Sequence, residues 1–442
     1  MNKSAKLLIS ICGAGLVLFI VAAYFLVPRG PAEITKYARA YDRIMKEAKA
    51  DGVPTTRAAL YSVKLDDPRL GAFVLVRLLQ GIHPLLMQYC LDPKEKADFD
   101  TLWKGTSDDV MRLTELGDCP AFGDAYPSES AKGKATSIEF ADSTGRAMGM
   151  LGYQRMKVGD DKDALRLFEA GLKLGAAIES TDANRDVFTA GMHSRQYADT
   201  YLLIGSFYLF KDPRNVDVAL KMVRDHHPIP DLEHRLAADA ITAYQHWRDE
   251  FKKQLANVQP FNRDDVDSVP YEYAKDPRFL MASDAFFVES LHACIKALRN
   301  GGTKPVERAR AADARILAAA NDRDPLGRGL TAAFSDIHLE EMYKYYSFGR
   351  TALLTAHTIA KQYRREKKIP MDLKALGQVA IDPATGKPIE ITRTSTGFVL
   401  SNNLSDKDYL KDTTAPDVVY SEKEYGGTGD MLFLRVSLRF VD

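Results

Sequence analysis

The chain lacks the short motifs that identify most enzymes. It contains no G-x-S-x-G nucleophile turn, no G-x-x-x-x-G-K-[ST] phosphate loop, no G-x-G-x-x-G turn and no H-E-x-x-H zinc helix. An enzyme without these motifs remains conceivable, but the sequence gives no basis for naming a reaction. We therefore expect no cofactor and leave the question of catalysis open.

Cysteine is scarce, with 4 among 442 residues. Cys12 follows Ile11, where a lipoprotein signal needs a small residue, so the sequence disfavours a lipid anchor on this cysteine. Cys90 and Cys119 form a disulfide in an oxidising compartment, or remain two buried thiols, and both alternatives stay open. Cys294 has no obvious partner in the sequence.

Net charge is also absent, because 60 basic residues balance 60 acidic ones. This balance gives no electrostatic argument for binding nucleic acid or an anionic membrane surface. The composition is 45% apolar and 27% charged, which is typical of a globular protein with a substantial core.

One long segment lacks charge altogether. Leu7–Val27 is an uncharged run, and as a helix it spans about 31 Å, the thickness of a bilayer core. Lys3 and Lys6 precede the run and Arg29 follows it, which favours a cytoplasmic N-terminus. We expect a single-pass protein of the inner membrane whose bulk is extracytoplasmic or periplasmic. The alternative is a cleaved signal peptide, with a small-residue cleavage site at 21–23.

Helical periodicity dominates the next three hundred residues. A stretch rich in proline and glycine at 120–134 reads as a loop, and Gln259–Pro277 reads as a boundary or long surface loop. The predicted helices are Ile34–Ala50, Arg69–Tyr89, Asp98–Leu116, Leu232–Leu255, Phe279–Leu298, one that begins after Pro305, and Ser335–Lys367.

The clearest local pattern is a helical hairpin at Arg146–Ala177. Gly152, Ala164 and Phe168 have the offsets of a tetratricopeptide (TPR) repeat, in which the small glycine lets two helices approach and Ala164 packs opposite it. A turn is expected at 159–161. A second, less regular hairpin is expected from Gly205, so the pattern indicates irregular stacked hairpins rather than a uniform array.

Near the C-terminus the sequence pattern changes from helical spacing to short strand-like runs separated by turns. Strands are predicted at Ile389–Arg393, Gly397–Ser401, Val418–Ser421 and Met431–Val441. Before them, Asp382–Pro388 (DPATGKP) is predicted to be a compact turn, because its prolines preset φ and its glycine tolerates positive φ.

This C-terminal order resembles that of a group of membrane-anchored bacterial proteins of the planctomycete type, and the turn is similar to one in type II secretion major pseudopilins. The resemblance covers about the last hundred residues. It implies a pseudopilin-like module but no activity, since that group has none established. The matching residues are Pro370, Leu373, Leu376, Asp382, Pro383, Gly386, Lys387, Pro388, Gly397, Phe398, Leu400 and Ser401. The acidic calcium loop of pseudopilins has only a poor counterpart in Asp406, Asp408 and Asp412.

The fold expected from these observations is mainly α. It comprises an N-terminal transmembrane helix (1–30), an irregular α-helical-hairpin, TPR-like domain (31–334), and a long helix with a small C-terminal α+β, pseudopilin-like module (335–442).

One cluster of histidines raises a metal site as a weak hypothesis. His226, His227 and His234 lie close in sequence among carboxylates, and zinc takes about four such ligands. The alternative is a polar connection between helices in which Asp231 caps the second helix.

Other histidines favour structural roles. His292 and Cys294 are two residues apart, so on a helix they do not face each other as a nucleophile pair requires. His83 and His357 lie on mostly apolar helix faces and are expected in or beside the core. His338 is expected at the exposed start of the last long helix.

Three functional hypotheses follow. The first is a membrane-anchored binding or scaffold protein, held by the bilayer through Leu7–Val27, with a protein partner on its helical surface. The second is a component of a type II secretion or pilus-like machine. The third is a metal-dependent hydrolase that uses the histidines at 226, 227 and 234.

Overall fold

A computed structural model describes most of the chain beyond the first 29 residues, with gaps. The predicted anchor at 7–27 lies outside the described residues, and no helix among those that are described is long and apolar enough to cross a bilayer. The described residues are 30–56, 59, 145–179, 185–227, 229, 231–256, 276–320, 326, 333–334, 337–370, 373–393, 397–401, 418–420 and 433–437.

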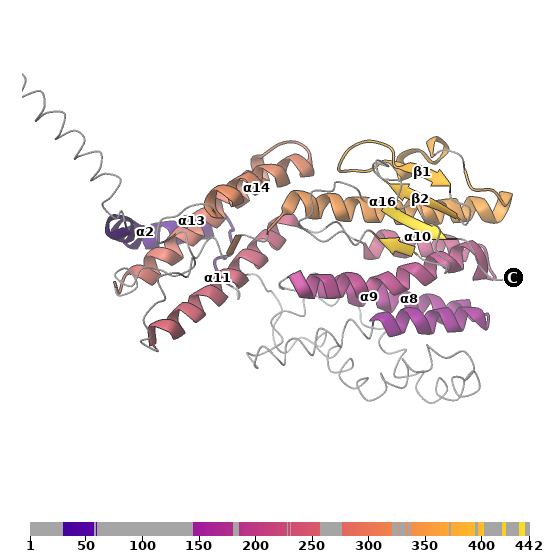
Figure 1. Cartoon of the computed structure of the whole chain (residues 1–442), viewed down its shortest axis with the longest axis horizontal. Coiled ribbons are helices and arrows are strands. Elements are labelled where there is room, and N and C mark those ends of the chain that lie inside the picture. The colour runs from indigo at the N-terminus through magenta and orange to yellow at the C-terminus, as the bar shows by residue number, and fades with distance from the viewer. Residues whose placement is uncertain are drawn as a thin grey trace, which may run out of the picture. The chain divides into compact units, whose positions relative to one another are not determined.

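These residues are mainly helical, with a small sheet near the C-terminus (Figure 1). Residues 145–157 are also helical. The α-helices are α2 (Gly30–Ala50), α8 (Asp161–Glu179), α9 (Arg185–Ile204), α10 (Asn215–His226), α11 (Leu232–Ala256), α13 (Phe279–Asn300), α14 (Pro305–Ala320) and α16 (Leu339–Glu366). A π-helix, η5 (Gly205–Leu209), continues α9, and a 3₁₀-helix, η6 (Lys374–Ala380), follows α16.

The helices predicted within the described residues are confirmed, with boundaries that shift by a few residues. The long last helix ends where basic residues meet the negative end of the helix dipole, and Lys367 closes it in the left-handed conformation at φ 55°. The helices predicted at 69–89 and 98–116, the loop at 120–134 and nearly all of Gln259–Pro277 lie outside the described residues.

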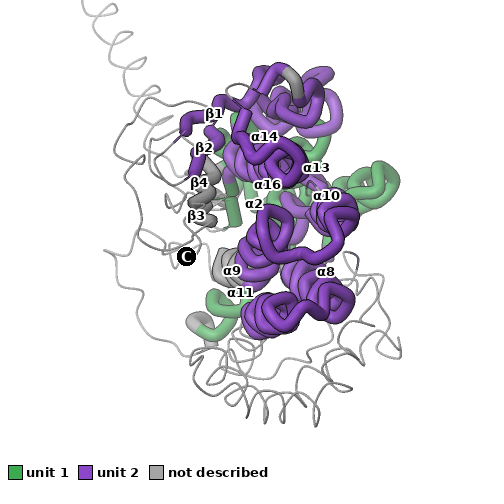
Figure 2. Tube along the Cα trace, turned by 90° about the vertical axis from the view of Figure 1, so that its right-hand side faces the viewer, with its two compact units in different colours: residues 1–55, 243–296, 314–337 green, residues 56–242, 297–313, 338–442 purple. Residues whose placement is uncertain are grey.

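Contacts divide the chain into two compact units (Figure 2). Unit 1 comprises residues 1–55, 243–296 and 314–337, and unit 2 comprises 56–242, 297–313 and 338–442. The borders fall inside α11, α13 and α14, so they differ from the sequence division at 30 and 334. In unit 2 the C-terminal residues therefore belong to the same compact body as the hairpin helices.

Aromatic packing forms the core of unit 1. The ring of Tyr244 stacks on that of Phe287, with centroids 4.0 Å apart and planes 5° from parallel. The Tyr244 hydroxyl donates to Asp284 Oδ1 at 3.0 Å, and Arg248 binds both oxygens of the same carboxylate at 2.9 Å. Asp284 thus satisfies two polar groups at the edge of the core.

The predicted hairpin is present within unit 2. Gly152 lies against the ring of Phe168, so close that a β-carbon on the glycine would be 2.6 Å from Phe168 Cε1. Ala164 is fully buried as well, but the nearest neighbour of Gly152 is the phenylalanine ring. Gly159 makes the turn at φ 85°, a conformation that favours glycine.

Helix α16 is the centre of unit 2. Its buried seam includes Leu353, Ala356 and Ala360, as the spacing predicts, and it packs against α10, η5, η6 and the sheet. Figures 1 and 2 show the sheet on one side of α16 and the layer of α8, α9 and α10 on the other. One continuous core therefore joins the hairpin helices to the C-terminal sheet.

The sheet is antiparallel with strand order β1-β2-β4-β3. All four predicted strands are confirmed, as β1 (Glu390–Arg393), β2 (Gly397–Ser401), β3 (Val418–Tyr420) and β4 (Phe433–Ser437). Strand β2 is buried along its whole length and pairs Leu400 with Leu434 of β4.

The turn before the sheet is also as predicted. Buried Asp382 accepts hydrogen bonds from the Ala384 amide at 3.0 Å and from the Thr385 hydroxyl at 2.9 Å. Gly386 has φ 69° and donates its amide to the Asp382 carbonyl at 2.7 Å. The aspartate therefore organises the turn through its own side chain.

Candidate functional site: a buried polar cluster in unit 2

The three histidines of the metal hypothesis have separate surroundings. His226 Nε2 lies 3.4 Å from Glu169 Oε1, whereas His227 Nε2 lies 2.8 Å from Asp199 Oδ1. His234 lies in the first turn of α11, where its amide donates to Asp231. The described residues contain no group of three side chains arranged to hold a metal ion.

The predicted cap at Asp231 is confirmed. Its Oδ1 accepts from the amides of Glu233 at 3.0 Å and His234 at 3.3 Å, which satisfies two free N–H groups at the start of α11. This part of the histidine-rich segment therefore serves helix formation.

His292 and Cys294 do not form a reacting pair. Both are buried in unit 1, and His292 Nε2 lies 2.7 Å from Asp51 Oδ2, which also accepts from Lys296 at 3.1 Å. The imidazole is thus used to join α13 to the end of α2.

Among the described residues, a buried polar cluster lies in unit 2. Ser206 of η5 and His357 of α16 are fully buried, with 2.8 Å between Ser206 Oγ and His357 Nδ1. Asp199 of α9 is 1% exposed and binds His227, which directly follows α10. Arg195 of α9 donates to the His226 carbonyl at 3.2 Å. The cluster therefore links three helical segments that are distant in sequence.

One tautomer of His357 fits both contacts of Ser206. The Ser206 hydroxyl donates to the Leu202 carbonyl at 3.0 Å, and in the tautomer with the proton on Nδ1 its oxygen accepts from His357. His357 Nε2 then carries the lone pair, and it has no hydrogen-bond partner among the described residues. This is the reverse of nucleophile activation, in which the imidazole accepts the serine proton.

Burial lowers the pKa of the imidazoles of His227 and His357 and so favours their neutral forms. Loss of hydration lowers the pKa of His357 to about 4, against the opposing charge of Asp199. Burial also lowers the pKa of His227, and the Asp199 carboxylate offsets this only in part. His357 is therefore neutral near pH 7 and becomes charged only under acid conditions.

A second polar contact holds the π-helix. Arg364 of α16 donates to the carbonyls of Gly205 at 3.3 Å, Ser206 at 3.4 Å and Phe210. A helix end leaves its last carbonyls without helical partners, and one guanidinium supplies donors there. The Gly205 carbonyl also accepts from the Phe210 amide at 3.0 Å. Burial lowers the pKa of Arg364, and Asp161 and Asp212 oppose the shift.

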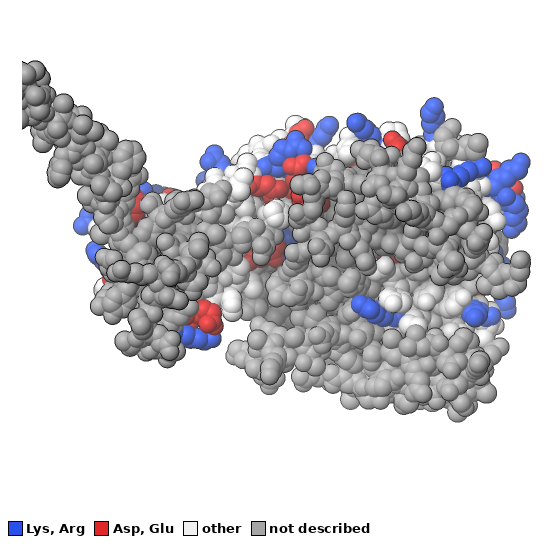
Figure 3. Space-filling model, viewed as in Figure 1, with Lys and Arg blue, Asp and Glu red and all other residues white. Residues whose placement is uncertain are grey.

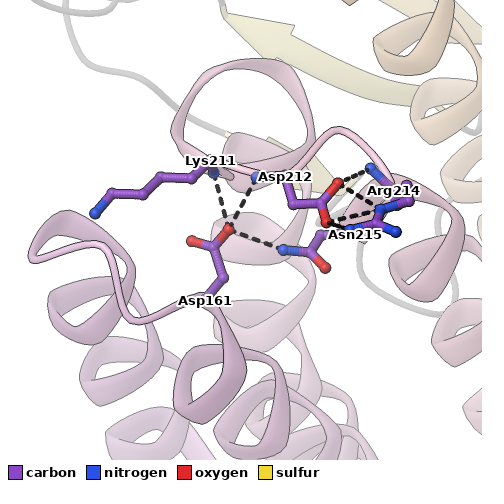
Figure 4. Close-up of polar contacts among 5 residues, drawn as sticks. All are labelled: Asp161, Lys211, Asp212, Arg214 and Asn215. Atoms are coloured by element: carbon purple, nitrogen blue, oxygen red, sulfur yellow. Dashed lines mark hydrogen bonds and ion pairs between the residues drawn. The ribbon is translucent and has the colours of Figure 1, made fainter.

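The third contact lies at the start of α8 (Figure 4). Asp161 Oδ2 accepts from the amides of Lys211 at 2.8 Å and Asp212 at 3.3 Å, and from Asn215 Nδ2 at 2.8 Å. Asp212 in turn binds Arg214, whose amide and side chain both donate to it. One carboxylate oxygen thus fixes the connection between η5 and α10 against the hairpin.

We expect Asp161→Ala to lower the free energy of unfolding by about 2 kcal/mol, since three donors lose their acceptor. Urea unfolding followed by circular dichroism measures this change. Asp163→Ala is the matched control, because Asp163 lies in the same helical turn and its loss removes only the dipole contribution and a long, exposed ion pair with Arg166, together roughly 0.5 kcal/mol. Equal losses in the two variants would contradict the role assigned to the Asp161 hydrogen bonds.

Comparison with known proteins yields no relative. No protein-family model, no curated protein and no solved structure matches the chain. The resemblance of the C-terminal residues to planctomycete-type and pseudopilin modules therefore stays a prediction.

Sequence reasoning missed most of this cluster. Asp199 and Ser206 carry no local signal, because their partners are 28 and 151 residues away along the chain. Arg364 also carries no local signal, because the three carbonyls that it binds belong to a segment more than 150 residues before it. His357 is in the core, as its apolar helix face predicts.

Proposed function

We propose that this protein is a membrane-anchored, extracytoplasmic binding or scaffold protein. The uncharged run Leu7–Val27 would retain it in the inner membrane, and its helical body would present a surface to a protein partner. Stacked helical hairpins of the TPR-like kind expose extended faces that suit such a role.

The main observation behind this proposal is that the serine, histidine and aspartate side chains in the interior of unit 2 are bonded to one another and buried. Ser206 and His357 are fully buried and bind each other, and Asp199 binds His227 in the same interior. A substrate would have to enter the packed core to reach them. Their contacts hold the helices of unit 2 together. This supports a structural role for these side chains, in a body that binds a partner through its surface.

Membrane retention tests the first half of the proposal. Leu16→Arg with Leu18→Arg places two charges at the centre of the run, at a cost of about 3 kcal/mol each. We expect the parent chain to stay with membranes through an alkaline wash and the double variant to be released. Leu16→Ile with Leu18→Ile is the matched control and should stay bound. An intact parent chain dissolved in the cytosol would overturn the proposal.

Partner binding tests the second half. Crosslinking in intact cells, followed by purification of the detergent-solubilised chain, should recover one specific protein in stoichiometric amount. Treatment of spheroplasts with a protease should degrade the body from outside. If no partner is recovered after crosslinking, the scaffold role fails even when the anchor holds.

A second candidate is a component of a secretion or pilus-like machine. The order of α16, the turn at 382–388 and an antiparallel sheet packed on the helix favours it. Removal of the residues after Pro370 should then abolish secretion of a reporter protein. Unchanged secretion by that truncated chain would exclude this candidate.

A further inference from the structure

Basic side chains gather at the end of unit 2 where α16 ends. Figure 3 shows Lys and Arg at that end, although the whole chain has no net charge. They come from the hairpin turn, from the connection after η5 and from the end of α16. We name as the basic end face the exposed residues Lys157, Lys162, Lys211, Arg365, Lys367 and Lys368.

Three contacts bring these segments together. Arg364 binds carbonyls of η5 and of Phe210, directly before Lys211. Asp161 binds the Lys211 amide at 2.8 Å, and the Lys211 ammonium lies against Gly159 of the hairpin turn. The basic end face is therefore a fixed feature of the fold.

The acidic side chains at this end are used internally. Asp160 pairs with Arg155, and Asp161 binds backbone amides. Asp212 pairs with Arg214. Within the described part of the chain, no carboxylate forms an ion pair with any residue of the basic end face. The surface consequently keeps an excess of positive charge.

Two further acidic residues, Asp217 and Glu366, lie near this end of unit 2. Asp217 pairs with Lys361 at 2.5 Å, on the side of α16 that meets the start of α10. Glu366 accepts from the Gln362 amide at 3.1 Å. Asp217 is thus paired with a cation outside the basic end face, whereas the exposed Glu366 keeps its negative charge beside six cations.

Helix dipoles explain only part of the clustering. Cations at the end of α16 are favourable, because that end carries negative partial charge. Lys162, however, lies in the first turn of α8, whose positive end disfavours a cation. The Asp160 carboxylate attracts Lys162 as well, so the dipole of α8 does not alone set the charge at this end of unit 2.

The aromatic rings below the cations are already occupied. Tyr153 stacks on Tyr201 with centroids 4.6 Å apart and carries Lys157 at 5.3 Å. Tyr363 contacts Phe207 and carries Lys367 at 5.7 Å. Recognition of single-stranded nucleic acid relies on free ring faces for stacking bases. A charged surface without such faces favours lipid headgroups instead.

We propose that the basic end face docks on anionic phospholipid headgroups of the membrane that holds the protein. This inference rests on the proposed anchor, which would keep the surface near the bilayer and make a weak charge contact effective. The contact is screened by salt, because its charges are exposed.

Hydrogen exchange of the full-length chain in lipid nanodiscs tests the docking. Discs of phosphatidylcholine alone are compared with discs that also contain phosphatidylglycerol. We expect amides at the end of α16 to exchange roughly tenfold more slowly in the anionic discs at low salt, with the difference lost at high salt. A triple variant that reverses three charges of the basic end face should abolish the difference. Its substitutions are Lys211→Glu, Arg365→Glu and Lys368→Glu.

The control reverses three exposed cations elsewhere in unit 2, Lys221, Arg224 and Lys304, and should retain the slower exchange. Equal exchange in both kinds of disc, or equal loss in the control, would overturn the inference. Protection by an added oligonucleotide but not by anionic lipid would overturn it in favour of nucleic acid. Release of the chain from neutral discs by high salt would instead mark failure of the anchor, so the two proposals fail distinguishably.

Discussion

Replacing Gly149 with alanine is expected to lower the free energy of unfolding by about 3 kcal/mol. A β-carbon at this position would lie 2.7 Å from the carbonyl carbon of Tyr197 and 2.8 Å from the amide nitrogen of Ala198. Both atoms belong to the backbone of α9, so they cannot move aside as a flexible side chain can. The substitution must push two packed helices apart, and urea unfolding measures the loss.

Gly349→Ala is the matched control for Gly149. Gly349 lies inside α16, and among the described residues no atom outside the helix's own backbone lies within 4 Å of a β-carbon built there. Alanine is favoured over glycine inside helices, so we expect a gain of about 0.5–1 kcal/mol. If both variants lose the same stability, close helix approach at Gly149 is not the cause.

The second large effect is a loss of stability in mild acid. The pKa of His357 is about 4 in the folded protein and about 6.5 in an unfolded chain. Between these values the unfolded chain binds the extra proton, so the free energy of unfolding falls as the pH falls. We expect this group to contribute a loss of about 2 kcal/mol between pH 7 and pH 5. His227 adds to it in the same direction.

Urea unfolding at a series of pH values measures this dependence. His357→Gln removes the titrating group while keeping polar atoms in the cluster, and its curve should be flatter below pH 7. His246→Gln removes an exposed histidine of α11 and should follow the parent curve. A parent-like slope in the His357 variant would show that the acid sensitivity arises elsewhere.

Local rules predicted much of the fold. The seam of α16 follows from helical spacing, and the turn at 382–388 follows from the φ preferences of proline and glycine. Strand β2 was predicted with its observed bounds because its apolar residues stand between turn signals. Asp231 was predicted as a cap from its place before an apolar periodic segment.

Long-range contacts could not be predicted in the same way. The π-helix at Gly205 depends on Arg364 and His357, which follow it by some 150 residues. The sequence suggested a second hairpin from Gly205 but not the π-helix that begins there, which α10 follows after a short connection. Such contacts arise only when α16 is packed against α9, and no short pattern records that packing.

The interleaving of the two units bears on how fragments of this protein can be prepared. Unit 1 draws residues from three separate stretches, the last of which extends to 337, and unit 2 needs α16 for its core. A fragment that stops at 334 would lack the central helix of unit 2, and one that starts at 335 would lack the layers on which that helix rests. During synthesis on the ribosome, neither unit has all its parts until more than three quarters of the polypeptide has emerged.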